Sequence, residues 1–128
     1  MPTLSSFDYA VLRVVPRVDR EEFMNAGVIL FCLERRFLRA EFHTDPNRLY
    51  ALSPGLDLEV VKQHLEAVVR LCKGGAETGP IGELSQRERF HWLVAPRSTI
   101  IQTSAVHSGL CEAPELATQH LMEQLVFL

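Results

Sequence analysis

Two continuous apolar runs near the start of the chain constrain its fold more than any other feature. In the first run, residues 7–15, both faces of a strand are apolar: Phe7, Tyr9, Val11 and Val15 on one, Ala10, Leu12 and Val14 on the other. A strand of this kind is covered on both sides, so it belongs near the middle of a sheet. The second run, residues 26–33, is too short for a lone helix and predicts a second strand.

Weaker patterns predict the other strands and the turns between them. Pro16 ends the first strand because it lacks an N–H, and residues 18–25 predict a helical turn capped by Asp19. Residues 37–43 alternate apolar and polar side chains, which predicts a third strand with one wet face. Residues 99–104 predict a fourth strand, after which the chain is expected to run as a loop.

Capping signals predict three helices. Asp57 caps a helix that runs to Lys73 and stops at two glycines, and residues 74–82 follow as a flexible loop. Ser85 has capping-box spacing to Glu88 at the start of a short helix. A terminal helix runs from Pro114 to residue 127, while residues 45–47 predict a turn. The sequence therefore predicts a single α+β domain over residues 1–128, with helices packed on a mostly antiparallel sheet of three to four strands.

Charge and cysteine usage narrow the class of protein. The net charge of −3, and the absence of Lys and Arg after Gly109, argue against nucleic-acid binding. Nucleic-acid binding through Arg35, Arg36 and Arg39 therefore stays only as a third hypothesis. Cys32, Cys72 and Cys111 form no metal or disulfide motif and are expected to be small core residues in a reducing compartment. With no secretory leader and no long apolar span, we expect a cytoplasmic protein that does not enter a membrane.

A search for catalytic and binding motifs finds none. Phosphate-binding glycine loops, zinc-protease and nucleophile-elbow patterns and paired cysteines are all missing from the sequence. The five histidines are scattered, and His43 and His107 lack the spacing of a two-histidine phosphoesterase. We therefore expect no catalytic constellation, no metal site and no cofactor.

Residues 85–109 are the segment in which a site would most plausibly form, because polar side chains gather there. The candidates for binding a ligand or partner are Arg97, Ser98, Gln102, Ser104 and His107. Arg97 at the start of the fourth strand and His107 beyond its end could frame a pocket for a carboxylate or phosphate. The favoured alternative is an edge strand with a solvated face and Arg97 in a surface ion pair.

Two other segments carry weaker candidates. Asn25 either shapes the turn before the second strand or presents its amide to a ligand or partner, and Gly27 suits a bulge or a close approach. The structural interpretation is favoured for both. The end of the terminal helix, with Met122, Phe127 and Leu128, is exposed unless it docks on the sheet or on another chain, and docking within the chain is favoured.

Two blocks of the sequence, Tyr9–Cys32 with its N-x-G-V motif and Arg89–Gly109, resemble a known family. They are similar to bacterial proteins catalogued as domain of unknown function 3037. The residues that match these blocks are Asn25, Gly27, Arg97, Ser98, Gln102 and Ser104. Members are often encoded beside proteins with a HipA-like kinase domain, so the resemblance implies a small accessory or binding partner.

The leading hypothesis is a cytoplasmic accessory protein, not an enzyme, that binds another protein, with a HipA-like kinase as one candidate partner. The runner-up is a small enzyme or binder that uses residues 97–107 for an anionic small molecule. In that reading Arg97 holds the anion, Gln102 and Ser104 orient it, and His107 acts as acid or base.

Overall fold

Five strands form one antiparallel sheet in the computed structural model, which describes residues 3–127. The strands are β1 (Ser5–Val14), β2 (Met24–Cys32), β3 (Phe37–Phe42), β4 (Ile101–Thr103) and β5 (His107–Cys111). They lie in the order β3-β2-β1, and the far side of β1 is shared, with β4 pairing its end and β5 its beginning. The predicted α+β class is confirmed, with one strand more than the three to four expected.

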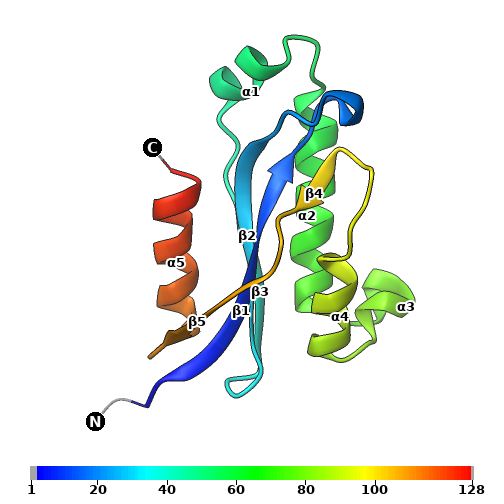
Figure 1. Ribbon diagram of the computed structural model, residues 1–128. Coiled ribbons are helices and arrows are strands. Elements are labelled where there is room, and N and C mark those ends of the chain that lie inside the picture. Colours follow the sequence, from blue (N-terminus) through cyan, green and yellow to red (C-terminus); the bar gives the residue numbers. More distant parts are fainter. Residues whose placement is uncertain (1–2, 128) are drawn as a thin grey trace.

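Helices cover both faces of this sheet. They are α1 (Pro46–Leu52), α2 (Leu58–Lys73), α3 (Gly79–Gly82), α4 (Gln86–Leu93) and α5 (Pro114–Leu125), with short 3-10 turns η1 (Val18–Arg20) and η2 (Ala76–Thr78). Figure 1 shows the sheet nearly edge-on, with α2 and α4 on one side and α5 on the other. This arrangement explains why β1 and β2 are apolar on both faces.

The core is divided by the sheet into two layers. Leu12, Val14, Ile29 and Phe31 pack against α2 and α4, where the ring of Phe31 stacks on that of Phe90 at 5.4 Å between centroids. On the opposite face, Phe7, Val28 and Leu30 pack toward α5. The two faces predicted for the first strand are thus confirmed for Phe7 on one side and for Leu12 and Val14 on the other.

The strand at residues 107–111 is a correction, because this segment was expected to be a loop. Its sequence holds no β-branched residue, so nothing local favours a strand. Pairing with β1, from Ser5 opposite Cys111 to Tyr9 opposite His107, creates it. A Cβ at Gly109 would lie 2.7 Å from the ring of Phe7, so the strand depends on a residue without a side chain at that point.

The capping predictions are confirmed at two helices and wrong at η1. Asp57 accepts from Val60 N at 3.2 Å at the start of α2, and Ser85 and Glu88 form the capping box of α4. Asp19 caps nothing: it lies inside η1, whose N-cap is Arg17, and its carboxylate pairs with the Arg17 guanidinium at 2.8 Å.

Three further segments differ from their predictions. The expected turn at residues 45–47 is the start of α1, because Asp45 accepts from two N–H groups there and Pro46 fits the first helical position. The predicted loop 74–82 contains η2 and α3.

The terminal helix ends at Leu125, and Met122 is buried against the sheet, so docking within the chain is confirmed for Met122. Phe127 remains 44% exposed, and Leu128 lies outside the described residues.

The three cysteines are free and buried, as expected. Burial raises the pKa of the Cys72 thiol to about 12, so the thiol stays protonated at neutral pH. A protonated, buried thiol is a poor nucleophile and a poor metal ligand, which fits a packing role for this residue.

Candidate functional site

Three of the predicted site residues lie together at the edge of β4. Arg97, Gln102 and Ser104 line one shallow pocket of about 220 Å³, with Val94 and Pro96 among the residues that complete it. The lining contains one cation and no carboxylate. Such a lining suits a small anion better than a cation.

The guanidinium of Arg97 is held by the side chain and backbone of one residue, Trp92. It lies 4.1 Å above the centre of the Trp92 ring, and its Nη2 donates to the Trp92 carbonyl oxygen. Burial lowers the pKa of Arg97. No carboxylate pairs with it within residues 3–127, so the expected surface ion pair is replaced by this stacking contact.

Gln102 lines the pocket with its amide already bonded within the chain, and Ser98 lies outside it. The amide Nε2 of Gln102 donates to the Thr99 carbonyl oxygen at 3.0 Å, which closes the turn before β4. Ser98 is exposed and does not line the pocket. Most of the polar capacity at this edge is therefore engaged within the chain.

Ser104 fastens the segment between β4 and β5 to β1. Its N–H donates to the Val11 carbonyl oxygen at 2.9 Å, and its Oγ accepts from the Val11 N–H at 2.8 Å. The same hydroxyl donates to the Ala105 carbonyl oxygen at 2.8 Å. The hydroxyl thus takes the place of a backbone acceptor for β1 at the point where β4 has ended and β5 has not yet begun. This role is structural.

We expect Ser104→Ala to lower the free energy of unfolding by about 1–2 kcal/mol, because it leaves the buried Val11 N–H without an acceptor. Urea denaturation followed by circular dichroism measures the change. Ser98→Ala is the matched control, since Ser98 is an exposed serine on the same segment and should change stability by less than about 0.5 kcal/mol. Equal stability of the two variants would contradict the bridging role.

His107 lies apart from this pocket. It pairs with Tyr9 across β1 and β5, and the two rings are 5.4 Å apart between centroids. Tyr9 packs toward α5, whereas the Arg97 pocket includes Val94 at the end of α4, on the other side of the sheet. The structure brings Arg97, Gln102 and Ser104 together and does not bring His107 to them.

Asn25 holds the end of the terminal helix. Its Nδ2 donates to the Leu125 carbonyl oxygen at 3.1 Å, and Nη1 of Arg48 donates to the Val126 carbonyl oxygen at 3.4 Å. Both oxygens lie at the C-terminal end of α5, on its last residue and its C-cap, where carbonyls lack helical partners of their own. The Asn25 amide is therefore engaged within the chain, but at the end of α5; Asn25 itself lies inside β2 and not in a turn before it.

A groove between β5 and α5 is the feature that sequence reasoning missed. It encloses about 350 Å³ and is mainly apolar, with these residues along it: Phe7, Leu110, Cys111, Glu112, Ala113, Leu116, Ala117, His120, Leu121 and Gln124. Leu110 is 66% exposed and Leu116 is 58% exposed. The usable signal was Leu110, a large apolar side chain flanked by Gly109 and Cys111, but it has no meaning until residues 107–111 are known to form an edge strand.

The comparisons with known proteins place the chain in a family. The family model described as "Protein of unknown function (DUF3037)" matches residues 9–126. The chain belongs to the DUF3037 family. Searches of curated proteins and of solved structures find no match to this DUF3037 protein.

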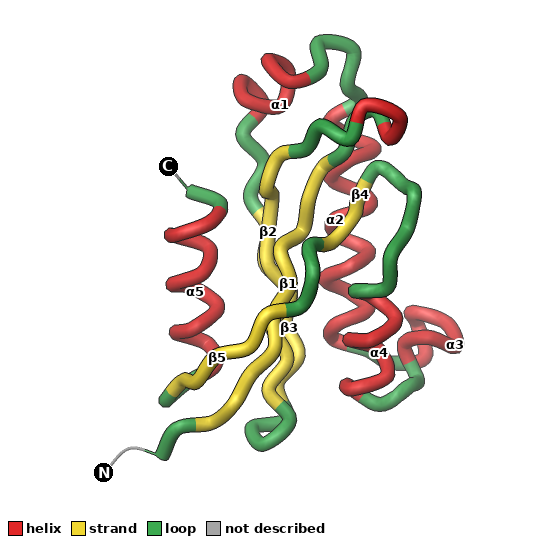
Figure 2. Tube along the Cα trace, in the orientation of Figure 1, coloured by secondary structure: helices red, strands yellow, loops and turns green. Residues whose placement is uncertain are grey.

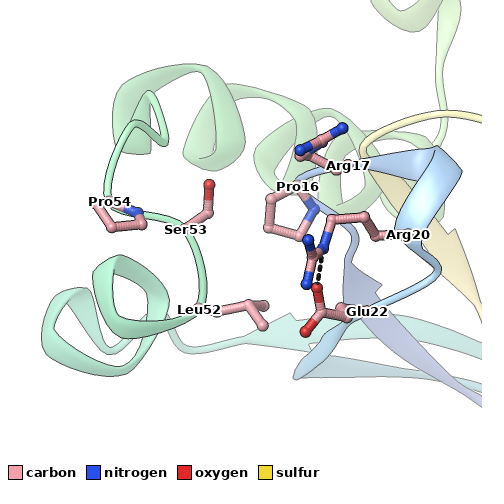
Figure 3. A pocket seen from close by; sticks show the side chains of 7 residues that line it. All are labelled: Pro16, Arg17, Arg20, Glu22, Leu52, Ser53 and Pro54. Carbon is pink, nitrogen blue, oxygen red and sulfur yellow. Dashed lines mark hydrogen bonds and ion pairs between the residues drawn. The ribbon is translucent and has the colours of Figure 1, made fainter.

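A further pocket of the DUF3037 protein lies beside η1 and encloses about 320 Å³ (Figure 3). Two arginines, Arg17 and Arg20, line it. Each is already paired with a carboxylate, Arg17 with Asp19 and Arg20 with Glu22. The hydrogen bond to Glu22 raises the pKa of Arg20. Because the charges are neutralised locally and the pairs are exposed, this pocket is a weaker anion site than its arginines suggest.

Within residues 3–127 of the DUF3037 protein, no three His, Cys, Asp or Glu side chains are grouped so that they could hold a metal ion. No helix in that range is long and apolar enough to cross a membrane.

Proposed function

We propose that this DUF3037 protein is a cytoplasmic accessory protein, not an enzyme, that binds another protein through the groove between β5 and α5. A HipA-like kinase is a candidate partner, in keeping with the genomic neighbourhood that the family resemblance implies. The free, buried cysteines support a reducing compartment.

The observation that carries this proposal is the apolar surface at the groove. Leu110 and Leu116 line it, and each exposes more than half of its surface. Burying an exposed leucine against a partner contributes about 1.5–3 kcal/mol, so two such residues beside a concave apolar surface can anchor an interface. Within residues 3–127, the pockets beside η1, Leu33, Asn25 and Arg97 do not combine two leucines of that exposure.

Affinity purification of the tagged protein from its native host tests the proposal. We expect the wild type to retain one stoichiometric protein, and Leu110→Asp to lose it, because the charge must be desolvated in the groove. Leu33→Asp is the matched control: Leu33 is 60% exposed at the turn between β2 and β3, and its variant should retain the partner. Recovery of the chain alone, or equal retention by both variants, contradicts the proposal.

The Arg97 pocket favours a second candidate, a binder of a small carboxylate- or phosphate-bearing molecule. Its support is the grouping of Arg97, Gln102 and Ser104 around one concavity. Among the described residues, 3–127, only one nitrogen of the Arg97 guanidinium donates a hydrogen bond, so further N–H groups are available to an anion. If the purification returns the chain alone, this pocket becomes the leading candidate.

A further inference from the structure

One side of β5 is unpaired. The strand pairs with β1 along its whole length, and no other strand within residues 3–127 pairs with it. In an antiparallel strand, alternate residues turn their N–H and C=O groups away from the neighbour, so β5 offers a row of free backbone groups. In Figure 2 the strand crosses in front of the sheet, with no helix or strand drawn over it.

The usual protections of an edge strand are missing from β5. Proteins commonly block such edges with lysine, proline or an inward-pointing charge. The strand, His107–Cys111, contains no Lys, Arg, Asp, Glu or Pro. One of its exposed side chains is apolar, since Leu110 is 66% exposed. The edge is therefore open to pairing with an extended segment.

The groove next to this edge provides places for side chains. Residues Leu110 and Cys111 of β5 line it on one side, and Leu116, Ala117 and Leu121 of α5 on the other. A strand added to β5 would point every second side chain toward the groove. Backbone pairing and apolar side-chain pockets are the two components of peptide recognition by strand addition.

The charges around the groove select a basic occupant. Glu112 lines it, and Glu123 is exposed on the same helix face as Leu116, one heptad later. Neither glutamate forms a salt bridge within the described residues, and no Lys or Arg lines the groove. A second copy of this chain would bring its own glutamates to the same place, and like charges facing each other disfavour that pairing.

We propose that β5 accepts an added strand from its partner: an extended segment with an apolar anchor for the groove and lysine or arginine beside it. The proposal rests on the proposed function, because it names the partner chemistry for the same groove.

A random dodecapeptide library displayed on phage, selected against the full-length protein, provides the probe. We expect the selected peptides to be enriched in Lys and Arg and to carry apolar residues at alternate positions. Synthetic copies are then measured by isothermal titration. Leu110→Asp should weaken binding by about tenfold or more, whereas the Leu33→Asp control should bind as the wild type does. Glu112→Gln combined with Glu123→Gln should reduce binding several-fold at low salt and much less at high salt.

Alternate N-methylation of the peptide separates strand addition from other modes. Methylating the amides at odd positions or at even positions removes opposite sets of N–H groups. Strand addition predicts that one set lowers affinity by about tenfold or more and that the other leaves it nearly unchanged. Equal loss with both sets, apolar spacing of three and four residues, or acidic selected peptides would overturn the strand proposal.

The outcomes of the two tests are distinguishable. If the native partner depends on Leu110 but the peptides fail the methylation test, the groove binds protein by another mode and only strand addition is lost. If selection gives no peptide that depends on Leu110, strand addition is overturned whatever the purification shows. If the purification also returns the chain alone, both proposals fail.

Discussion

Replacing Arg89 with methionine is expected to lower the free energy of unfolding by about 3 kcal/mol or more, because it leaves buried carbonyl oxygens without donors. Arg89 is only 8% exposed. Its Nη1 donates to the carbonyl oxygens of Leu71 at 2.8 Å and Cys72 at 2.6 Å, and its Nε donates to that of Leu84 at 3.0 Å. Two of these oxygens end α2, where helical carbonyls have no partners of their own.

The charge of Arg89 matters as well as its donors. No carboxylate pairs with it within residues 3–127, so the negative end of the α2 dipole is its main electrostatic partner. Gly74, directly after α2, leaves the space that the guanidinium occupies: a Cβ at Gly74 would lie 2.6 Å from Nη1 of Arg89. Arg89→Lys keeps the charge but has no planar fork of donors, so its loss should be smaller than that of methionine.

Urea unfolding, followed by circular dichroism and by the fluorescence of Trp92, measures these differences. Arg87→Met is the matched control, because Arg87 is exposed on the same helix and makes no hydrogen bond among the described residues. We expect it to change stability by less than about 0.5 kcal/mol. A loss below about 1 kcal/mol for Arg89→Met would show that water replaces the guanidinium at these oxygens.

The parts of the fold that could be predicted are those with local signals. The apolar faces of β1 and β2 follow from side chains within each strand, and the starts of α2 and α4 follow from Asp57 and Ser85 beside their helices. The strand at 107–111 had no such signal, because its pairing with β1 joins residues about a hundred positions apart. Asp45 and Pro46 fit a turn and a helix start equally well, so only the packing of α1 decides between them.

The same distinction holds for the candidate site. Arg97, Gln102 and Ser104 could be grouped from the sequence because they flank one short strand. Arg89 could not be recognised as an anchor, since its partners lie in the last turn of α2. His107 was grouped with Arg97 by proximity in sequence, but the change of strand at Ser104 carries it to a position opposite Tyr9.

Gly27→Ala is expected to destabilise the protein by about 2–3 kcal/mol, and the reason is a close approach of two strands. Gly27 pairs with Leu12 on one side and Phe42 on the other, directly after an irregularity in the pairing of β1 with β2. A Cβ there would overlap the carbonyl oxygen of Glu41 and lie 3.0 Å from Cβ of Phe42. The carbonyl is backbone of a paired strand, so relief requires the strands to separate.

Gly55→Ala is the matched control for this substitution. Gly55 lies between α1 and α2, has no positive φ, and a Cβ there would meet nothing within 4 Å. Losing a glycine at an unstrained site reduces the entropy of the unfolded chain, so this variant should be unchanged or more stable by about 0.4–1 kcal/mol. Thermal and urea unfolding of both variants give the comparison. If Gly27→Ala were as stable as the wild type, β2 and β3 could move apart at no cost. Close packing would then not explain the glycine of the N-x-G-V block. The alternative explanation is a binding role for this block, but the hydrogen bond from Asn25 to the Leu125 carbonyl oxygen argues against that role for Asn25.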